Sequence, residues 1–158
     1  MPRFMVDSNW YGWDGPENVT NRVKNRCLAL SLANAVISFT CGVVSTGVTR
    51  HNWVGFAATA ALIALMMEII GAVRFRRAPH VTDKRTFDSI HQMMRWSAQC
   101  HMILMALAFA AGAVSCFQAF GGIPDLLILS GFAASFACSW FFLRAYSGLP
   151  TYSIKAPD

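Results

Sequence analysis

Four long apolar stretches dominate the chain, separated by short polar or glycine-containing segments. They cover Cys27–Val48, Trp53–Val73, Trp96–Phe120 and Leu126–Leu143. An α-helix that crosses a bilayer needs roughly 20 apolar residues, at about 1.5 Å each. The pattern therefore predicts an all-α, polytopic membrane protein, an antiparallel bundle of four transmembrane helices in which the third helix begins near residue 89.

The composition agrees with this prediction. Hydrophobic residues make up 55% of the chain and charged residues 13%, whereas a soluble domain carries about 25% charged residues. The bundle is predicted over residues 21–147, between a polar and aromatic N-terminal segment (1–20) and a C-terminal tail (148–158). Tryptophan and tyrosine in the N-terminal segment are expected to lie at the lipid headgroups or against a partner protein.

Lysine and arginine are concentrated at one end of the predicted bundle. The tight turns at the opposite end hold only Arg50, and Arg95 falls within a helix. By the positive-inside rule, both termini face the cytoplasm, or an equivalent matrix or stroma. This placement accounts for the net charge of +5 without a nucleic-acid partner. The other basic residues are Arg3, Arg22, Lys24, Arg26, Arg74, Arg76, Arg77, Lys84, Arg85, Arg144 and Lys155.

The third stretch carries a polar stripe that includes His91, Arg95 and Gln99. Glu68, near the end of the second stretch, and Arg95 are both predicted to lie about 9–10 Å inside the cytoplasmic edge. Because a lone charge in a transmembrane helix costs about 2.5–3.5 kcal/mol, we expect these two residues to pair, with His91 or Gln99 within hydrogen-bond reach. Alternatively, Arg95 extends to the interface on its long side chain. His101 points away from the stripe and is interpreted as a hydrogen-bonded interior residue.

The segment between the second and third stretches is strongly basic. Its charges serve mainly as a topology signal. They also form a candidate patch for anionic lipid headgroups, since each charge contributes about 1 kcal/mol near such a surface. The patch consists of Arg74, Arg76, Arg77, Lys84 and Arg85.

No catalytic, cofactor-binding or metal-binding residue is predicted. The sequence offers no Cys-x-x-Cys pair, no glycine-rich phosphate loop and no recognisable catalytic triad. A haem held between two helices needs a histidine on each, whereas His91 and His101 lie on the same predicted helix. A haem within one copy is therefore not expected, while one shared between chains stays open.

These features favour a non-enzymatic integral membrane protein that acts as a structural or assembly subunit, or as a scaffold, within a membrane complex. Its partners would be the lipid bilayer and other membrane subunits, or further copies of itself. Small residues along the first, second and fourth stretches are typical of close helix packing and support this interpretation. The alternative is a small ion- or proton-coupled channel or transporter that uses Glu68, His91 and Arg95, because ionisable residues inside a membrane are functional candidates.

Overall fold

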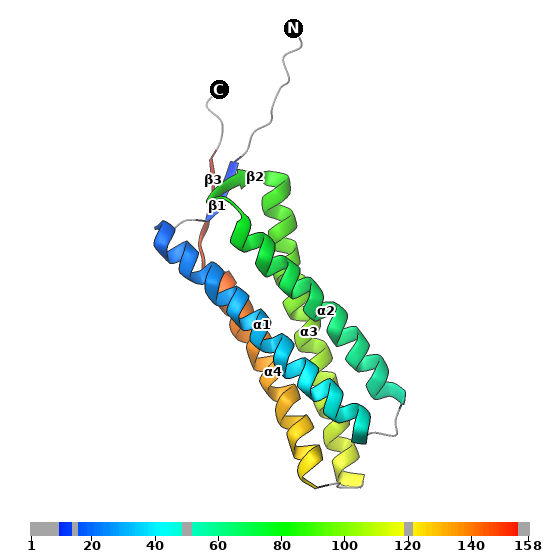
Figure 1. The fold of residues 1–158 in the computed structure, drawn as a ribbon. Helices are drawn as coiled ribbons and strands as arrows, with labels where there is room; N and C mark the ends of the chain where they lie inside the picture. The colour runs from blue at the N-terminus through cyan, green and yellow to red at the C-terminus, as the bar shows by residue number, and fades with distance from the viewer. Residues whose placement is uncertain (1–9, 14–15, 49–51, 119–121, 155–158) are drawn as a thin grey trace.

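Four long helices make up most of the structure, a computed structural model that describes residues 10–13, 16–48, 52–118 and 122–154. Each helix packs against two neighbours in the cyclic order α1, α2, α3, α4, and successive helices run antiparallel (Figure 1). The predicted all-α fold class is confirmed. The helices are α1 (Glu17–Val48), α2 (Asn52–Arg77), α3 (Lys84–Gln118) and α4 (Ile123–Ser147).

The helices are longer than the apolar stretches that predict them. All four extend further at the end of the bundle where the termini lie, and α3 begins at Lys84 rather than near residue 89. Phe120, the predicted end of the third stretch, lies outside the described residues. Two described stretches, Lys84–Val114 and Asp125–Ser147, are long and apolar enough to cross a membrane, judged by length and composition.

The start of α3 is capped by an aspartate. Asp83 precedes the helix, and its Oδ2 accepts a hydrogen bond from the backbone N–H of Thr86 at 2.9 Å. Such a bond satisfies one of the first amides of a helix, which have no partner within it. Hydrogen bonds from the side chain and the backbone of Thr86 hold the pKa of Asp83 below its ordinary value of 3.8.

We expect this cap to make the stability of the fold sensitive to acid. Because the pKa of Asp83 is lower in the folded state, its carboxylate stabilises the fold above the ordinary value of 3.8, and this contribution is lost as the pH falls through the folded pKa. Asp83→Asn should therefore weaken the acid dependence of the melting temperature. Circular dichroism melts from neutral to strongly acidic pH would measure it, and an unchanged dependence would contradict the prediction.

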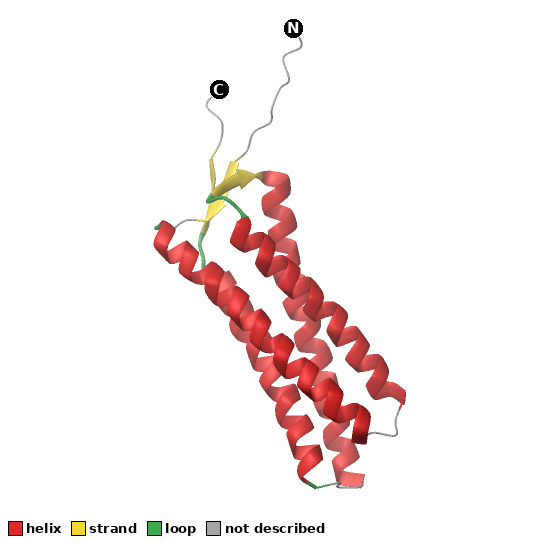
Figure 2. Ribbon diagram, viewed as in Figure 1, coloured by secondary structure: helices red, strands yellow, loops and turns green. Residues whose placement is uncertain are grey.

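A small antiparallel sheet lies at the end of the bundle where the chain enters and leaves it (Figure 2). Its central strand, β1 (Trp10–Trp13), pairs with β2 (Val81–Asp83) and β3 (Thr151–Ile154). At Gly12 a Cβ atom would lie 2.7 Å from the ring of Tyr152 and 2.9 Å from the carbonyl oxygen of the residue before β2. Only glycine therefore fits the centre of the sheet without displacing its neighbours.

An aromatic core lies where the sheet meets the helices. Trp13 is fully buried, with its ring centroid 5.0 Å from that of Phe75 and 5.2 Å from that of Phe87. Lys24 lies beside these rings and donates a hydrogen bond from Nζ to the carbonyl oxygen of Ala78 at 2.6 Å. Burial lowers the pKa of Lys24. Trp13 thus belongs to the interior, which corrects the expectation that it lies at lipid headgroups or against a partner.

The outward faces of all four helices carry large apolar side chains. Towards the sheet, at the ends of the helices beyond these side chains, the exposed residues are mostly charged or polar. The exposed apolar residues include Leu32, Val36 and Phe39 on α1, Leu62, Ile63, Met66 and Ile70 on α2, Trp96, Ile103, Leu107 and Val114 on α3, and Leu126, Leu127, Trp140 and Phe141 on α4.

Candidate functional site

A chain of hydrogen bonds inside the bundle connects all four helices. Asn34 comes from α1, Glu68 from α2 and His101 from α3, and α4 supplies Ser135 and Ser139. All five side chains are buried, none with more than 1% of its surface exposed. They form the candidate site, which we call the polar chain.

Asn34 is the centre of the polar chain. Its Nδ2 donates to the hydroxyl of Ser139 at 2.8 Å, and Ser139 donates in turn to Oε2 of Glu68 at 3.0 Å. On the other side of the amide, Oδ1 accepts the hydroxyl proton of Ser135 at 2.5 Å. One amide therefore holds two hydroxyl groups of α4 and, through one of them, the carboxyl group of α2.

The histidine completes the chain and its tautomer follows from the bonding. Ser135 has a single hydroxyl proton, which it donates to Asn34. Its Oγ must therefore accept the contact with Nε2 of His101 at 2.9 Å, so the proton of the neutral imidazole lies on Nε2. Ser38 also lies 3.2 Å from this oxygen. Every bond then points in one direction, from the histidine towards the carboxyl group of Glu68.

Both ends of the polar chain leave one buried atom unused. Among the described residues, Oε1 of Glu68 and Nδ1 of His101 have no hydrogen-bond partner. Hydroxyl groups and imidazoles can receive a proton and release another, but the amide of Asn34 would have to become an imidic acid to do so. The arrangement is therefore better suited to holding four helices in register than to passing protons.

The predicted ion pair between Glu68 and Arg95 is wrong. Arg95 is exposed, and its Nη1 lies 3.4 Å from Nε2 of His91. Nδ1 of His91 lies 3.0 Å from the hydroxyl of Tyr146 on α4, and Gln99 is exposed. The structure thus brings His91 and Arg95 together, but it separates Glu68 from this group and directs it towards α1 and α4.

The error comes from the rotation of α3 about its axis. An estimate of depth places two residues at the same height but does not say which way each points. The inward face of α3 contains Ile90, Met94, Ala98, His101 and Met105, all buried. The polar stripe lies beside this face, and the interpretation of His101 as a hydrogen-bonded interior residue is confirmed.

Three members of the polar chain were not predicted as a site. Asn34 and Ser135 lie among the small and polar residues of the first and fourth stretches, where the sequence indicates helix packing rather than a site, and nothing in the sequence singles out Ser139 on its own. The signal in the sequence is the spacing of Ser135 and Ser139, four residues apart on one helix face. Within the described part of the chain, no group of three His, Cys, Asp or Glu side chains is placed to hold a metal ion.

Four of the five residues of the basic patch line two hollows of the surface. Arg74, Arg77 and Arg85 line a pocket of about 510 Å³ where α2 ends and α3 begins. Lys84 lines a neighbouring groove, and Arg76 is exposed outside both. The binding of lipid headgroups by this patch stays a prediction.

Comparison of this chain with protein-family models, with curated proteins and with solved structures finds no match. Its function therefore has to be argued from its own residues and their geometry.

Proposed function

We propose that the protein is a non-enzymatic, multi-pass integral membrane protein whose four helices all cross the bilayer, and that it acts as a structural or assembly subunit, or a scaffold, of a membrane complex. The observation that carries this proposal is the inverted polarity of the bundle. Apolar side chains cover its outside, while a carboxyl group, an amide, an imidazole and hydroxyl groups lie within it.

The inversion favours a lipid surrounding over water. Val36, Phe39 and Leu107 expose 68%, 69% and 63% of their surface, whereas Glu68 and His101 expose none. A monomer in water rarely exposes apolar patches of more than a few hundred Å². In lipid, helices attract one another through close packing and interhelical hydrogen bonds rather than through hydrophobic burial.

The distribution of charge supports one orientation of the bundle. The ends of α2 and α3 that adjoin the sheet carry Arg74, Arg76, Arg77, Lys84 and Arg85, all exposed. Both β1 and β3, the strands nearest the termini, lie at this same end (Figure 1). By the positive-inside rule, this distribution supports an orientation with both termini on the cytoplasmic side or its equivalent.

The polar chain supports a structural role over proton coupling. The alternative function would use Glu68 together with His91 and Arg95, but Glu68 bonds to Ser139 instead. Within the polar chain, the amide of Asn34 interrupts any path of hydroxyl and imidazole groups. Glu68 in this interpretation fixes the position of α2 against α4.

One set of measurements on the full chain tests this proposal. Alkaline carbonate should leave the protein in the membrane fraction, and tags on both termini should be accessible from the cytoplasmic side alone. Purified in mild detergent and reconstituted into liposomes, the protein should not raise their proton permeability, and Glu68→Gln should behave like the native protein. Proton flux that Glu68→Gln abolishes would favour the transporter instead, and release by carbonate would refute the membrane assignment.

A further inference from the structure

Two hollows of the surface meet along one side of α3. The larger is a groove of about 1130 Å³ between α2 and α3, and the smaller is the pocket of about 510 Å³ at the end of α2. Arg85 and Ser89 line both of them. The groove and the pocket therefore adjoin at these two residues, and an elongated ligand that passes Arg85 and Ser89 would reach both.

The pocket has the chemistry of an anion site. Arg74, Arg77 and Arg85 line it together with the hydroxyl-bearing residues Thr86 and Ser89, and no aspartate or glutamate among the described residues does. Guanidinium groups donate hydrogen bonds in a planar fork that matches the oxygens of a phosphate. Arg74 and Arg77 come from α2 and Arg85 comes from α3, so both helices contribute positive charge to the lining of the pocket.

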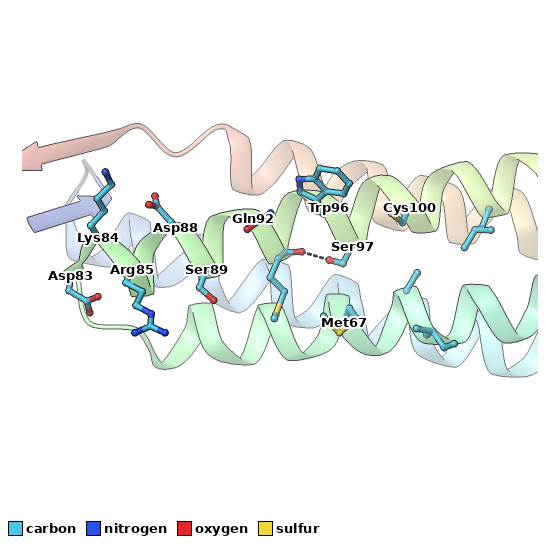
Figure 3. A pocket seen from close by; sticks show the side chains of 14 residues that line it. Met67, Asp83, Lys84, Arg85, Asp88, Ser89, Gln92, Trp96, Ser97 and Cys100 are labelled. Atoms are coloured by element: carbon cyan, nitrogen blue, oxygen red, sulfur yellow. Dashed lines mark hydrogen bonds between the residues drawn. The ribbon is translucent and has the colours of Figure 1, made fainter. Parts of the chain in front are cut away.

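The groove becomes apolar as it leaves the pocket. Figure 3 shows Arg85 and Ser89 on the side of α3 that faces α2 in this view, with Met67 of α2 further along. From Ser89 to Leu104, both of which line the groove, α3 rises about 22 Å at 1.5 Å per residue. One leaflet of a hydrocarbon core about 30 Å thick is about 15 Å deep. The groove is therefore long enough to follow an acyl chain through its leaflet.

The acidic residues of the groove do not oppose an anion in the pocket. Asp83 and Asp88 line the groove but not the pocket. Oδ2 of Asp83 is occupied by the amide of Thr86. In Figure 3, the carboxylate of Asp88 points away from the guanidinium group of Arg85. The positive charge is thus concentrated where a headgroup would lie.

We propose that this surface binds one molecule of an anionic phospholipid, with its phosphate held by Arg74, Arg77 and Arg85 and an acyl chain lying in the groove past Met67 and Trp96. The inference rests on the membrane assignment proposed above. The bound lipid is selected by the charge of its headgroup, unlike the bulk lipid around the protein. It lies on the side of the bundle formed by α2 and α3.

Binding to the purified protein in mild detergent tests the site. Phosphatidylglycerol, phosphatidylcholine and inorganic phosphate serve as probes, each titrated and measured by native mass spectrometry. We expect phosphatidylglycerol to bind with a stoichiometry of one and phosphatidylcholine much more weakly. The triple variant R74Q/R77Q/R85Q should bind phosphatidylglycerol roughly 100-fold more weakly, since three basic groups are removed from an anionic surface.

A matched control and a second variant separate the causes. The variant R22Q/R26Q/R144Q removes the same charge from exposed positions outside the pocket and should bind phosphatidylglycerol normally. Cys100→Trp fills the apolar part of the groove, where Cys100 is exposed. It should weaken the binding of phosphatidylglycerol but not that of inorganic phosphate. Equal loss in both triple variants, or tight binding of inorganic phosphate that Cys100→Trp leaves unchanged, would overturn the lipid site. Carbonate extraction tests the membrane assignment independently of these results.

Discussion

Replacing Asn34 by leucine is expected to lower the free energy of unfolding by about 1–3 kcal/mol. The change removes the central amide, so the hydroxyl of Ser135 loses its acceptor and that of Ser139 loses its donor. Interhelical hydrogen bonds in membrane proteins average about 0.6 kcal/mol each, which sets the lower limit for two bonds. A buried group left without a partner costs about 1–3 kcal/mol, which raises the upper limit.

Unfolding in detergent, followed by circular dichroism, would measure this loss. Val36→Leu serves as the control, because Val36 lies on the same helix with 68% of its surface exposed. It changes an exposed side chain by one methylene and should leave the stability unchanged. If Asn34→Leu were no more destabilising than Val36→Leu, the polar chain would not hold the four helices together.

The second large effect is expected at a tight contact between α1 and α4. A Cβ atom added at Gly131 would collide with Sγ of Cys41. Gly131→Ala should therefore destabilise the protein by about 1–3 kcal/mol, the usual cost of overpacking. Alanine also stabilises a helix by about 1 kcal/mol relative to glycine, and this gain offsets part of the cost. The expected net destabilisation therefore lies towards the lower part of the range.

When Cys41 is replaced by alanine, the effect of Gly131→Ala on stability is expected to change sign. With Cys41→Ala the sulfur is removed, and the nearest remaining atom, Cβ of residue 41, lies 3.4 Å from the new methyl group, an ordinary contact. Gly131→Ala should then be neutral or stabilising, because only its helix propensity remains. A double-mutant cycle measured by unfolding in detergent gives the coupling energy, and a coupling near zero would show that the two residues do not determine the spacing of these helices.

The helices could be predicted because each carries a long apolar stretch, a signal that is local in sequence. The sheet could not, because its strands have three or four residues and β1 pairs with segments about 70 and 140 residues away. Gly12 of β1 belongs to a residue type that is common in turns, whereas the structure uses it for a close approach to Tyr152. Nothing near these segments in the sequence specifies their partners.

The candidate site could be predicted in part. Glu68 shares one face of α2 with the small residues Ala61, Ala64 and Ala72, and all four side chains are buried. Its partner could not be deduced, because two charges of opposite sign at one depth are an attractive pair whatever the rotation of their helices. Ser139, which itself accepts a hydrogen bond from Asn34, supplies the bond to Glu68 that Arg95 was expected to supply.

The central position of β1 has a consequence for the order in which the molecule is made. A ribosome delivers β1 first and β3 last, with all four helices between them. Both helical hairpins can therefore form while the amino-terminal strand still has an open edge. That edge closes only after α4 has been made, so a chain truncated before Thr151 would keep its hairpins but present an unpaired strand to any neighbour.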